Sequence, residues 1–162
     1  IVTDKHQSII SKSPDVPIWL NGDRDRLAQV MTNLVSNASK YSAAGTSITI
    51  ESSISGDLFN MEVHDQGQGI KPQDIENLGT LFYRTDEAIN SSTQGTGIGL
   101  YLSKKIAGLH HGEIEINSEY EQGTTVKFTL PGATEAVPEE ANNTQPKTYT
   151  SRFEDLDLES AG

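Results

Sequence analysis

The sequence lacks cysteine, and none of its apolar runs approaches the roughly 20 residues that a membrane-spanning helix requires. Without cysteine, the chain has neither a disulfide framework nor a thiolate metal site, and this composition suits a reducing compartment. No signal-peptide pattern opens the chain. We therefore expect a soluble, cytoplasmic segment that makes no membrane contact; whether its parent protein is membrane-anchored stays open.

Positive charge is also scarce, because 12 Lys and Arg residues stand against 23 Asp and Glu residues, which gives a formal net charge of -11. Nucleic acid and anionic membranes would repel such a chain, so we expect no nucleic-acid partner. The four histidines are scattered apart from His110 and His111, which disfavours a histidine metal cluster. Any phosphate-binding site must therefore be local.

Composition predicts one domain followed by a tail. The chain of 162 residues, 34% of them hydrophobic, is long enough for one core. We place the domain at residues 1–131 and the tail at residues 132–162, where seven acids stand against Lys147 and Arg152. This acidic, Pro-containing composition predicts a disordered tail, to which we assign no function. Because the chain starts at Ile1 instead of Met, we also expect it to be a fragment.

Two periodicities alternate before Pro131. Period two predicts strands at Gln7 to Lys12, Ile18 to Leu20, Ser47 to Ile54, Leu58 to Val63, Gly112 to Ser118 and Thr124 to Leu130. Helical periodicity predicts one helix that begins near Asp23 or Arg24, a second from about Ile98 to Leu109, and a short one after Pro72. The first helix has one apolar stripe, made of Leu27, Val30, Met31, Leu34, Ala38 and Tyr41. The pattern predicts an α/β (α+β) two-layer sandwich, with three helices on one face of a mixed, mostly antiparallel sheet.

Asn33, Asn37 and Lys40 form a polar row on the first helix, roughly a third of a turn from the centre of its apolar stripe. Such a row lies at the edge of the core, where it can line a cavity. Amide oxygens are hard donors that suit magnesium, and an ammonium group suits phosphate. For Asn33 alone, an ordinary surface position explains the residue equally well.

A carboxylate is predicted to point inward at the end of the strand Leu58 to Val63. By period two, Asp65 shares the buried face of Phe59, Met61 and Val63. A buried carboxylate needs a donor, and the exocyclic amine of adenine is an attractive one. Gly67, together with Gly69, would let the backbone approach a flat ring, although this motif alone is equally compatible with a capped turn.

A third motif, Gly95, Gly97 and Gly99, leads directly into the second helix. Free backbone N–H groups and the helix dipole favour a phosphate there, while a flexible helix start is the simpler alternative. The spacing matches neither a Walker loop nor a Rossmann fingerprint. The preceding segment, Arg84 to Gln94, is polar and aperiodic, which is typical of a mobile lid.

Taken in order, these motifs resemble the ATP-binding catalytic domain of sensor histidine kinases, in the superfamily that includes gyrase, heat-shock chaperones and mismatch-repair ATPases. The N box reads "NLVSNASKY", the first glycine box "DQGQGI", the F box "LFYRTDEA" and the second glycine box "GTGIGL". Gly123 and Thr124 match the family's "GT" before the last strand. The resemblance covers roughly Gln7 to Leu130.

The resemblance implies a role for each residue of these motifs. Asn37 would bind Mg2+ between the phosphates of ATP with Asn33 beside it, Lys40 would contact phosphate, and Tyr41 would lie along the nucleoside. Asp65 would bind the adenine amine with help from Thr124. Gly67, Gly69 and Ile70 would shape the base site; Gly95, Thr96, Gly97, Ile98, Gly99 and Leu100 the phosphate end; and Phe82 and Arg84 would anchor the lid.

The activity is expected to be transfer of the γ-phosphate to a histidine. ATP hydrolases of the superfamily have a glutamate where this chain has Asn33, and an amide is no general base at neutral pH. None of the four histidines has the context of the family's acceptor, so the acceptor would belong to a separate dimerisation hairpin of a homodimeric parent, and a response regulator would follow. Three alternatives stay open: a hydrolase, a serine kinase of the anti-sigma-factor type, and a non-catalytic interaction module.

Overall fold

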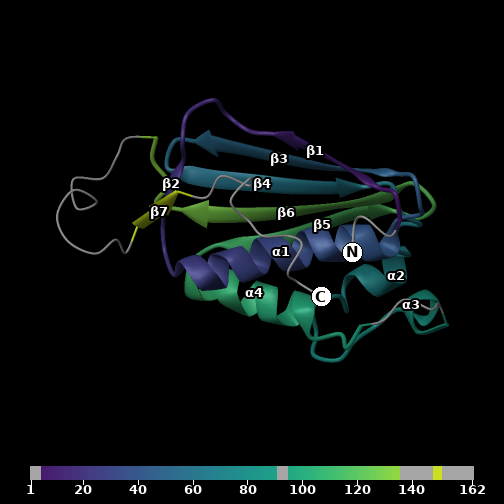
Figure 1. The fold of residues 1–162 in the computed structure, drawn as a ribbon. Helices are drawn as coiled ribbons and strands as arrows, with labels where there is room; N and C mark the ends of the chain where they lie inside the picture. Colours follow the sequence, from purple (N-terminus) through teal and green to yellow (C-terminus); the bar gives the residue numbers. More distant parts are fainter. Residues whose placement is uncertain (1–4, 91–94, 136–147, 151–162) are drawn as a thin grey trace.

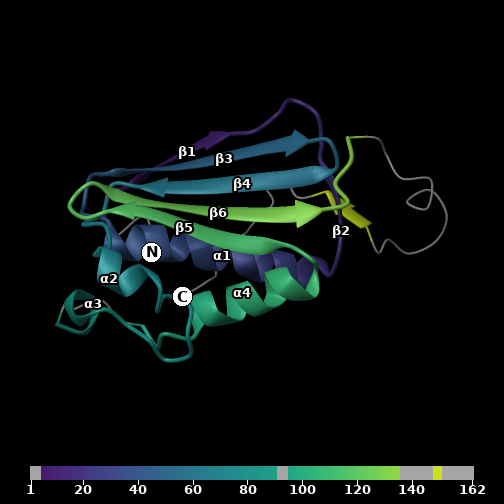
Figure 2. The same cartoon turned by 180° about the vertical axis from the view of Figure 1, so that it is seen from behind.

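The computed structural model describes residues 5–90, 95–135 and 148–150. A five-stranded sheet lies over two long helices, α1 (Arg24–Tyr41) and α4 (Gly99–Leu109), as Figures 1 and 2 show from opposite sides. The strands, in spatial order, are β1 (Ser8–Lys12), β3 (Ser47–Ser55), β4 (Leu58–Asp65), β6 (Gly123–Pro131) and β5 (Glu113–Glu119). β1 is parallel to β3, and every other pair in this sheet is antiparallel. The predicted fold class is confirmed.

Two short helices, α2 (Pro72–Ile75) and α3 (Asp86–Asn90), lie at the end of the domain where α1 ends and α4 begins (Figure 1). α3 is a fourth helix that the sequence did not predict. It falls within the predicted polar lid and is too short to show a helical period. The Thr85 hydroxyl caps the start of α3 by accepting a hydrogen bond from the Ala88 N–H at 3.2 Å.

α1 begins as predicted and is held by its apolar stripe. The Asp23 side chain caps the helix by accepting a hydrogen bond from the Arg26 N–H at 3.1 Å. Tyr41 is the exception to the predicted stripe, since its side chain is 39% exposed. It is the last residue of the helix and lines a cavity described below. The buried residues of α1 are Leu27, Val30, Met31, Leu34, Val35, Ala38 and Ser39.

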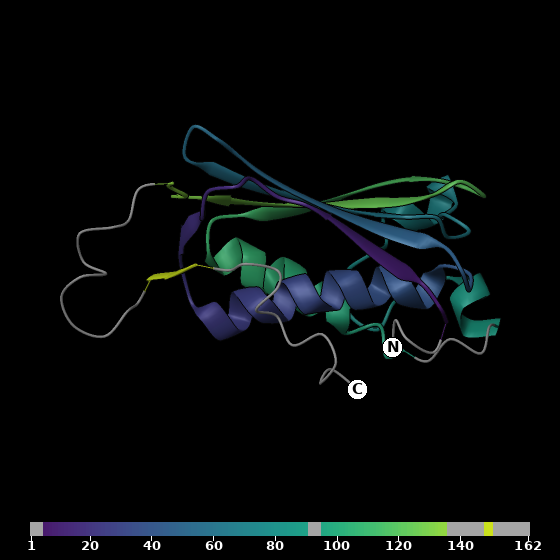
Figure 3. The same cartoon turned by 45° about the horizontal axis from the view of Figure 1, so that its top comes forward.

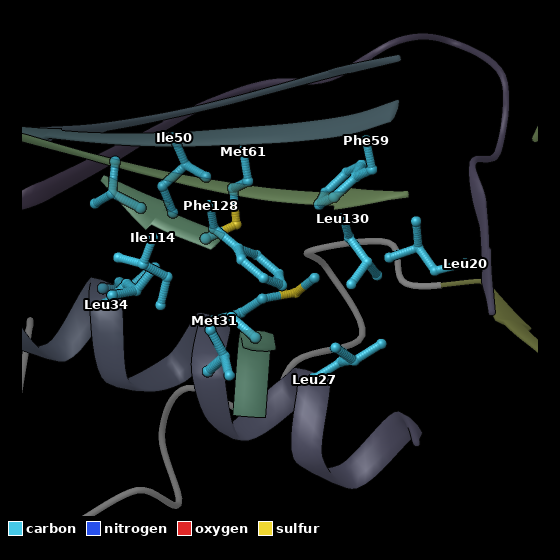
Figure 4. Packing of buried hydrophobic residues seen from close by; sticks show 14 of the residues in the cluster. Leu20, Leu27, Met31, Leu34, Ile50, Phe59, Met61, Ile114, Phe128 and Leu130 are labelled. Carbon is cyan, nitrogen blue, oxygen red and sulfur yellow. The ribbon is translucent and has the colours of Figure 1, made fainter. Parts of the chain in front are cut away.

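The core lies between the helices and the inner face of the central strands. Phe128 of β6 is fully buried and contacts Phe59 of β4 edge to face, with ring centroids 6.4 Å apart. Figure 4 shows these side chains pointing toward Met31 on α1, while Figure 3 shows α1 and α4 side by side beneath the sheet. In the parts of the chain that the structure describes, no helix is both long and apolar enough to span a bilayer.

Two further strands, β2 (Trp19–Asn21) and β7 (Thr148–Thr150), form a separate antiparallel pair. β7 lies in the segment that was predicted to be disordered. At these three residues the structure differs from that prediction, because their backbone pairs with β2. Trp19 also exchanges two backbone hydrogen bonds with Thr134, so ordered contacts extend past the predicted domain end at residue 131. The remaining tail, residues 136–147 and 151–162, lies outside the described residues.

Replacing Phe128 by alanine is expected to lower the free energy of unfolding by about 3–5 kcal/mol, because it leaves a cavity at the centre of the core. Denaturant unfolding followed by circular dichroism measures the change. Leu109→Ala is the control, since that side chain is 80% exposed, and its effect should stay within about 0.5 kcal/mol. Equal losses in the two variants would contradict the assignment of this core.

Candidate functional site

A cavity of about 450 Å³ opens between α1, the inner face of the sheet, the segments around residues 68–70 and 78–85, and the start of α4. It lies at the end of the domain where α2 and α3 are found (Figure 1). All the predicted site residues line this cavity except Gly67, Phe82 and Ile98. Those that do are Asn33, Asn37, Lys40, Tyr41, Asp65, Gly69, Ile70, Arg84, Gly95, Thr96, Gly97, Gly99, Leu100 and Thr124.

The side chains of the polar row on α1 differ in their contacts with the described residues: Asn33 is bonded within the protein, and Asn37 and Lys40 are not. The Asn33 amide nitrogen donates a hydrogen bond to the Ser103 hydroxyl of α4 at 2.9 Å. The Asn33 amide oxygen lies only 2.3 Å from where a Cβ atom on Gly99 would stand. The Asn33 side chain therefore forms part of the contact between α1 and α4. Within the described ranges, the side chains of Asn37 and Lys40 form no hydrogen bond or ion pair, so their polar groups remain available to a ligand.

Asp65 ends β4 and faces the cavity as its period-two position predicts. Its carboxylate accepts a hydrogen bond from the Gly67 N–H at 2.8 Å. Burial raises the pKa of Asp65 above its ordinary value of 3.8, and the N–H groups of Gly67 and Thr124, together with nearby His64, partly oppose that rise. A half-buried carboxylate of this kind has acceptor capacity left for a donor in the cavity.

The first glycine box is shaped by contacts within the protein. Gly67 does not line the cavity, and a Cβ atom there would lie 2.6 Å from the Tyr41 carbonyl oxygen. Gly69 has a φ of +66°, and its Cβ would lie 2.0 Å from the Glu119 carbonyl oxygen. Gly67 thus meets neighbouring backbone, and the expectation that both glycines make room for a ligand ring stays a prediction. Both positions exclude side chains so that neighbouring backbone segments can touch.

A network of hydroxyl groups that was not predicted from the sequence joins this box to β5 and β6. The Ile70 N–H donates to the Ser118 hydroxyl at 2.9 Å, and Ser118 also contacts the Thr124 hydroxyl at 2.9 Å. Thr124 thereby holds a fixed place beside Asp65, its partner in the register of β4 and β6. The sequence does indicate that Ser118 points inward, because period two puts it on the same strand face as Ile114 and Ile116.

The second glycine box also forms tight contacts. Gly97 has a φ of +71°, and its Cβ would lie 2.7 Å from the Phe82 carbonyl carbon. α4 starts at Gly99, so the preceding glycines stand at a helix N-terminus that opens on the cavity, as predicted. Ile98 is 37% exposed and lies outside the cavity. Residues 91–94 of the predicted lid lie outside the described residues.

The two F-box residues predicted to anchor the lid lie in different places. Phe82 has a φ of +65°, is 66% exposed and does not line the cavity. Tyr83 lines the cavity in its place, and its hydroxyl donates a hydrogen bond to Asp74 of α2 at 2.7 Å. This bond raises the pKa of Tyr83 above its ordinary value. Arg84 lines the cavity too, and its guanidinium donates to the Ala88 carbonyl oxygen.

Apolar residues complete the wall. Four of them, Leu34, Ala38, Ile116 and Val126, were expected to belong to the core or were not assigned to the site. Ile116 and Val126 are only partly buried, and both line the cavity. The periodicity of a strand identifies its inward face, but it does not distinguish a residue that meets a helix from one that meets a cavity. The four histidines all lie outside the cavity.

Comparison with known proteins agrees with this architecture. A family model described as "Histidine kinase-, DNA gyrase B-, and HSP90-like ATPase" matches residues 22–134. The sensor histidine kinase WalK of Bacillus subtilis (strain 168) is 36% identical over 130 residues, which cover 79% of this chain and 21% of WalK. A nucleotide-free catalytic domain of the histidine kinase ThkA superposes with a TM-score of 0.68 at 26% identity, covering 81% of this chain and 82% of that domain. Full-length ShkA in complex with AMPPNP gives a TM-score of 0.69 at 27% identity, with coverage of 85% and 28%.

The chain therefore belongs to the family of histidine kinase-, DNA gyrase B- and HSP90-like ATPases. Within this family, its resemblance to the catalytic ATP-binding domain of sensor histidine kinases is confirmed. The chain spans about a fifth of the length of WalK, at 21%.

Gly69→Ala is expected to destabilise the domain more than Gly56→Ala does. Both glycines have a similar positive φ, +66° and +63°, so both variants incur roughly 1–2 kcal/mol of left-handed backbone strain. Only at Gly69 does the new Cβ also meet a backbone oxygen, because nothing lies within 4 Å at Gly56. Thermal unfolding of the two variants measures the difference. Equal losses would mean that the contact between Gly69 and Glu119 is not tight.

Proposed function

We propose that this domain binds Mg-ATP and donates the γ-phosphate to a histidine on a separate dimerisation and phosphoacceptor hairpin, in two-component signal transduction. One observation carries the proposal: a single cavity is lined both by the inward carboxylate of Asp65 and by the amide and ammonium groups of Asn37 and Lys40. These groups suit the two chemically different ends of a nucleotide.

Asp65 is the proposed acceptor for the adenine amine. Its carboxylate already takes the Gly67 N–H and keeps further lone pairs for a donor in the cavity. The Thr124 hydroxyl, placed by Ser118, offers a second polar contact beside it. Guanine presents a carbonyl oxygen where adenine presents its amine, so an acceptor here selects adenine. Leu34, Ala38, Ile116 and Val126 would supply the apolar surface on which a purine can pack.

Asn37 is the proposed protein ligand of magnesium, and Lys40 the proposed phosphate contact. The site fits the ion, because Mg2+ takes few protein ligands, prefers oxygen, and uses nucleotide phosphates for its other positions. When bound, the ion neutralises charge on the phosphates during transfer. Among the described residues, no group of three His, Asp or Glu side chains could hold a metal by itself, so the metal would depend on the nucleotide.

The chemistry and the hydrogen bond of the Asn33 amide favour transfer of the γ-phosphate over hydrolysis of ATP. Its amide is a poor proton acceptor at neutral pH, and the hydrogen bond to Ser103 holds its nitrogen toward α4. Water in the cavity therefore has no base at this position. An imidazole brought from outside needs mainly correct placement and charge neutralisation. The response regulator, the homodimeric parent and the cytoplasmic location are further parts of this proposal.

The direct test mixes the purified chain with a helical hairpin that carries a phosphoacceptor histidine, together with ATP labelled at the γ-phosphate. We expect acid-labile, base-stable label on the hairpin histidine and little phosphate release without the hairpin. Asn37→Ala should abolish this transfer and make nucleotide affinity largely insensitive to magnesium. The control is Asn117→Ala, on the exposed side of β5, which should transfer normally. Acid-stable label on serine, or rapid phosphate release by the chain alone, would overturn the proposal.

Asp65→Asn is expected to weaken adenine nucleotide binding about ten- to a hundredfold and to erase the preference over guanine, because a charged acceptor is lost. Burial raises the pKa of Asp65, so wild-type affinity should be complete above that raised pKa and should fall as pH drops through it. Calorimetry from neutral pH toward pH 4 measures both variants, and their ratio cancels the titration of the nucleotide. Asp57→Asn, in an exposed turn, is the control. Unchanged affinity and base preference would refute the adenine contact.

A further inference from the structure

The last turn of α1 is held by residues that precede the sheet. A helix leaves its final carbonyl oxygens without partners from the helix itself. The Lys5 ammonium donates to three of these oxygens, those of Ser39, Lys40 and Ser42, at 3.0, 2.8 and 3.0 Å. A positive charge at a helix C-terminus also opposes the negative end of the helix dipole. A single side chain from 34 or more residues away thus completes the end of α1.

Gln7 strengthens this contact from a buried position. Its amide nitrogen donates to the carbonyl oxygens of Ser39, Ser42 and Ala43 at 3.1, 3.3 and 3.0 Å. Its amide oxygen accepts a hydrogen bond from the Ser39 hydroxyl at 2.7 Å. Gln7 is only 9% exposed, so these bonds are shielded from water and breaking one leaves a buried polar group unpaired. We call Lys5, Gln7 and the carbonyl groups that they hold the α1 clamp.

The α1 clamp acts on the turn that carries two cavity side chains, Lys40 and Tyr41. The next residue, Ser42, forms an isolated antiparallel bridge with Gly67. The Gly67 N–H in turn donates to the Asp65 carboxylate at 2.8 Å. An unbroken series of hydrogen bonds and backbone contacts therefore runs from Lys5 to the carboxylate at the base site. Loosening the end of α1 would move the proposed phosphate contact and the proposed adenine acceptor together.

We propose that Lys5 and Gln7 are positioning residues for the nucleotide site, and that the clamp sets the affinity of the domain for its nucleotide. This inference rests on the proposed function, since the ligand concerned is Mg-ATP. Neither residue lines the cavity, so the proposed effect on binding passes through α1 and Gly67. A clamp with only a structural role would change the unfolding temperature and leave the affinity of the folded protein unchanged.

The test measures binding of a nonhydrolysable ATP analogue with magnesium by calorimetry, at a temperature where every variant is fully folded. Lys5→Met keeps the aliphatic stem and removes the donor; we expect affinity to fall about three- to tenfold. Lys5→Arg keeps the cation and should restore affinity to within about twofold. Lys12→Met is the matched control: it removes a lysine on β1 whose partner is Glu51 at 2.6 Å, and it should leave affinity unchanged.

Amide hydrogen exchange of the nucleotide-free chain gives a second readout. Exchange at Ser42 and Gly67 should speed up in Lys5→Met and in the milder Ser39→Ala, which removes one bond to Gln7, and should not change in Lys12→Met. Unchanged affinity in Lys5→Met would overturn the inference, whatever the exchange shows, and so would equal affinity losses in Lys5→Met and Lys12→Met. If the wild-type chain binds no nucleotide while exchange responds as expected, the proposed function fails and the clamp stands as a structural link only.

Discussion

The packing of α1 against the inner face of the sheet is the constraint on which the site depends. Once Val30, Met31 and Leu34 are buried beneath β4 and β6, the helix cannot rotate about its axis without exposing apolar surface. Asn37 and Lys40 are then turned toward the cavity, because their angle from the buried stripe is set by the helical period. Core packing thus orients the polar groups without contacting them.

The cavity walls are held together by backbone segments in close contact. Gly67 admits the Tyr41 carbonyl oxygen, Gly69 admits that of Glu119, and Gly99 admits the Asn33 side chain. Each contact joins two segments that are distant in sequence, so the walls are assembled by tertiary structure. The hydrogen bonds of Lys5, Gln7 and Ser118 serve the same purpose for the end of α1 and for the turn before β6. Short side chains and satisfied polar groups together give the cavity a defined shape.

Asp65 is a cavity residue whose burial lowers the stability of the folded state. A carboxylate whose pKa is raised by burial destabilises the folded state at neutral pH relative to an exposed aspartate. The N–H groups of Gly67 and Thr124 offset part of that effect without removing it. Such a carboxylate at the end of a central strand supports the proposal that Asp65 binds a ligand.

Sequence periodicity alone determined the two layers, the long helices, the sheet strands and the inward direction of Asp65, because burial imposes periods of 2 and 3.6 on local sequence. It could not determine that Asn33 bonds Ser103, that Tyr83 instead of Phe82 lines the cavity, or that Ile116 borders a cavity. Nor did it indicate that Lys5 completes the end of α1. Each of these depends on which distant segment lies opposite, and only the tertiary structure brings those segments together.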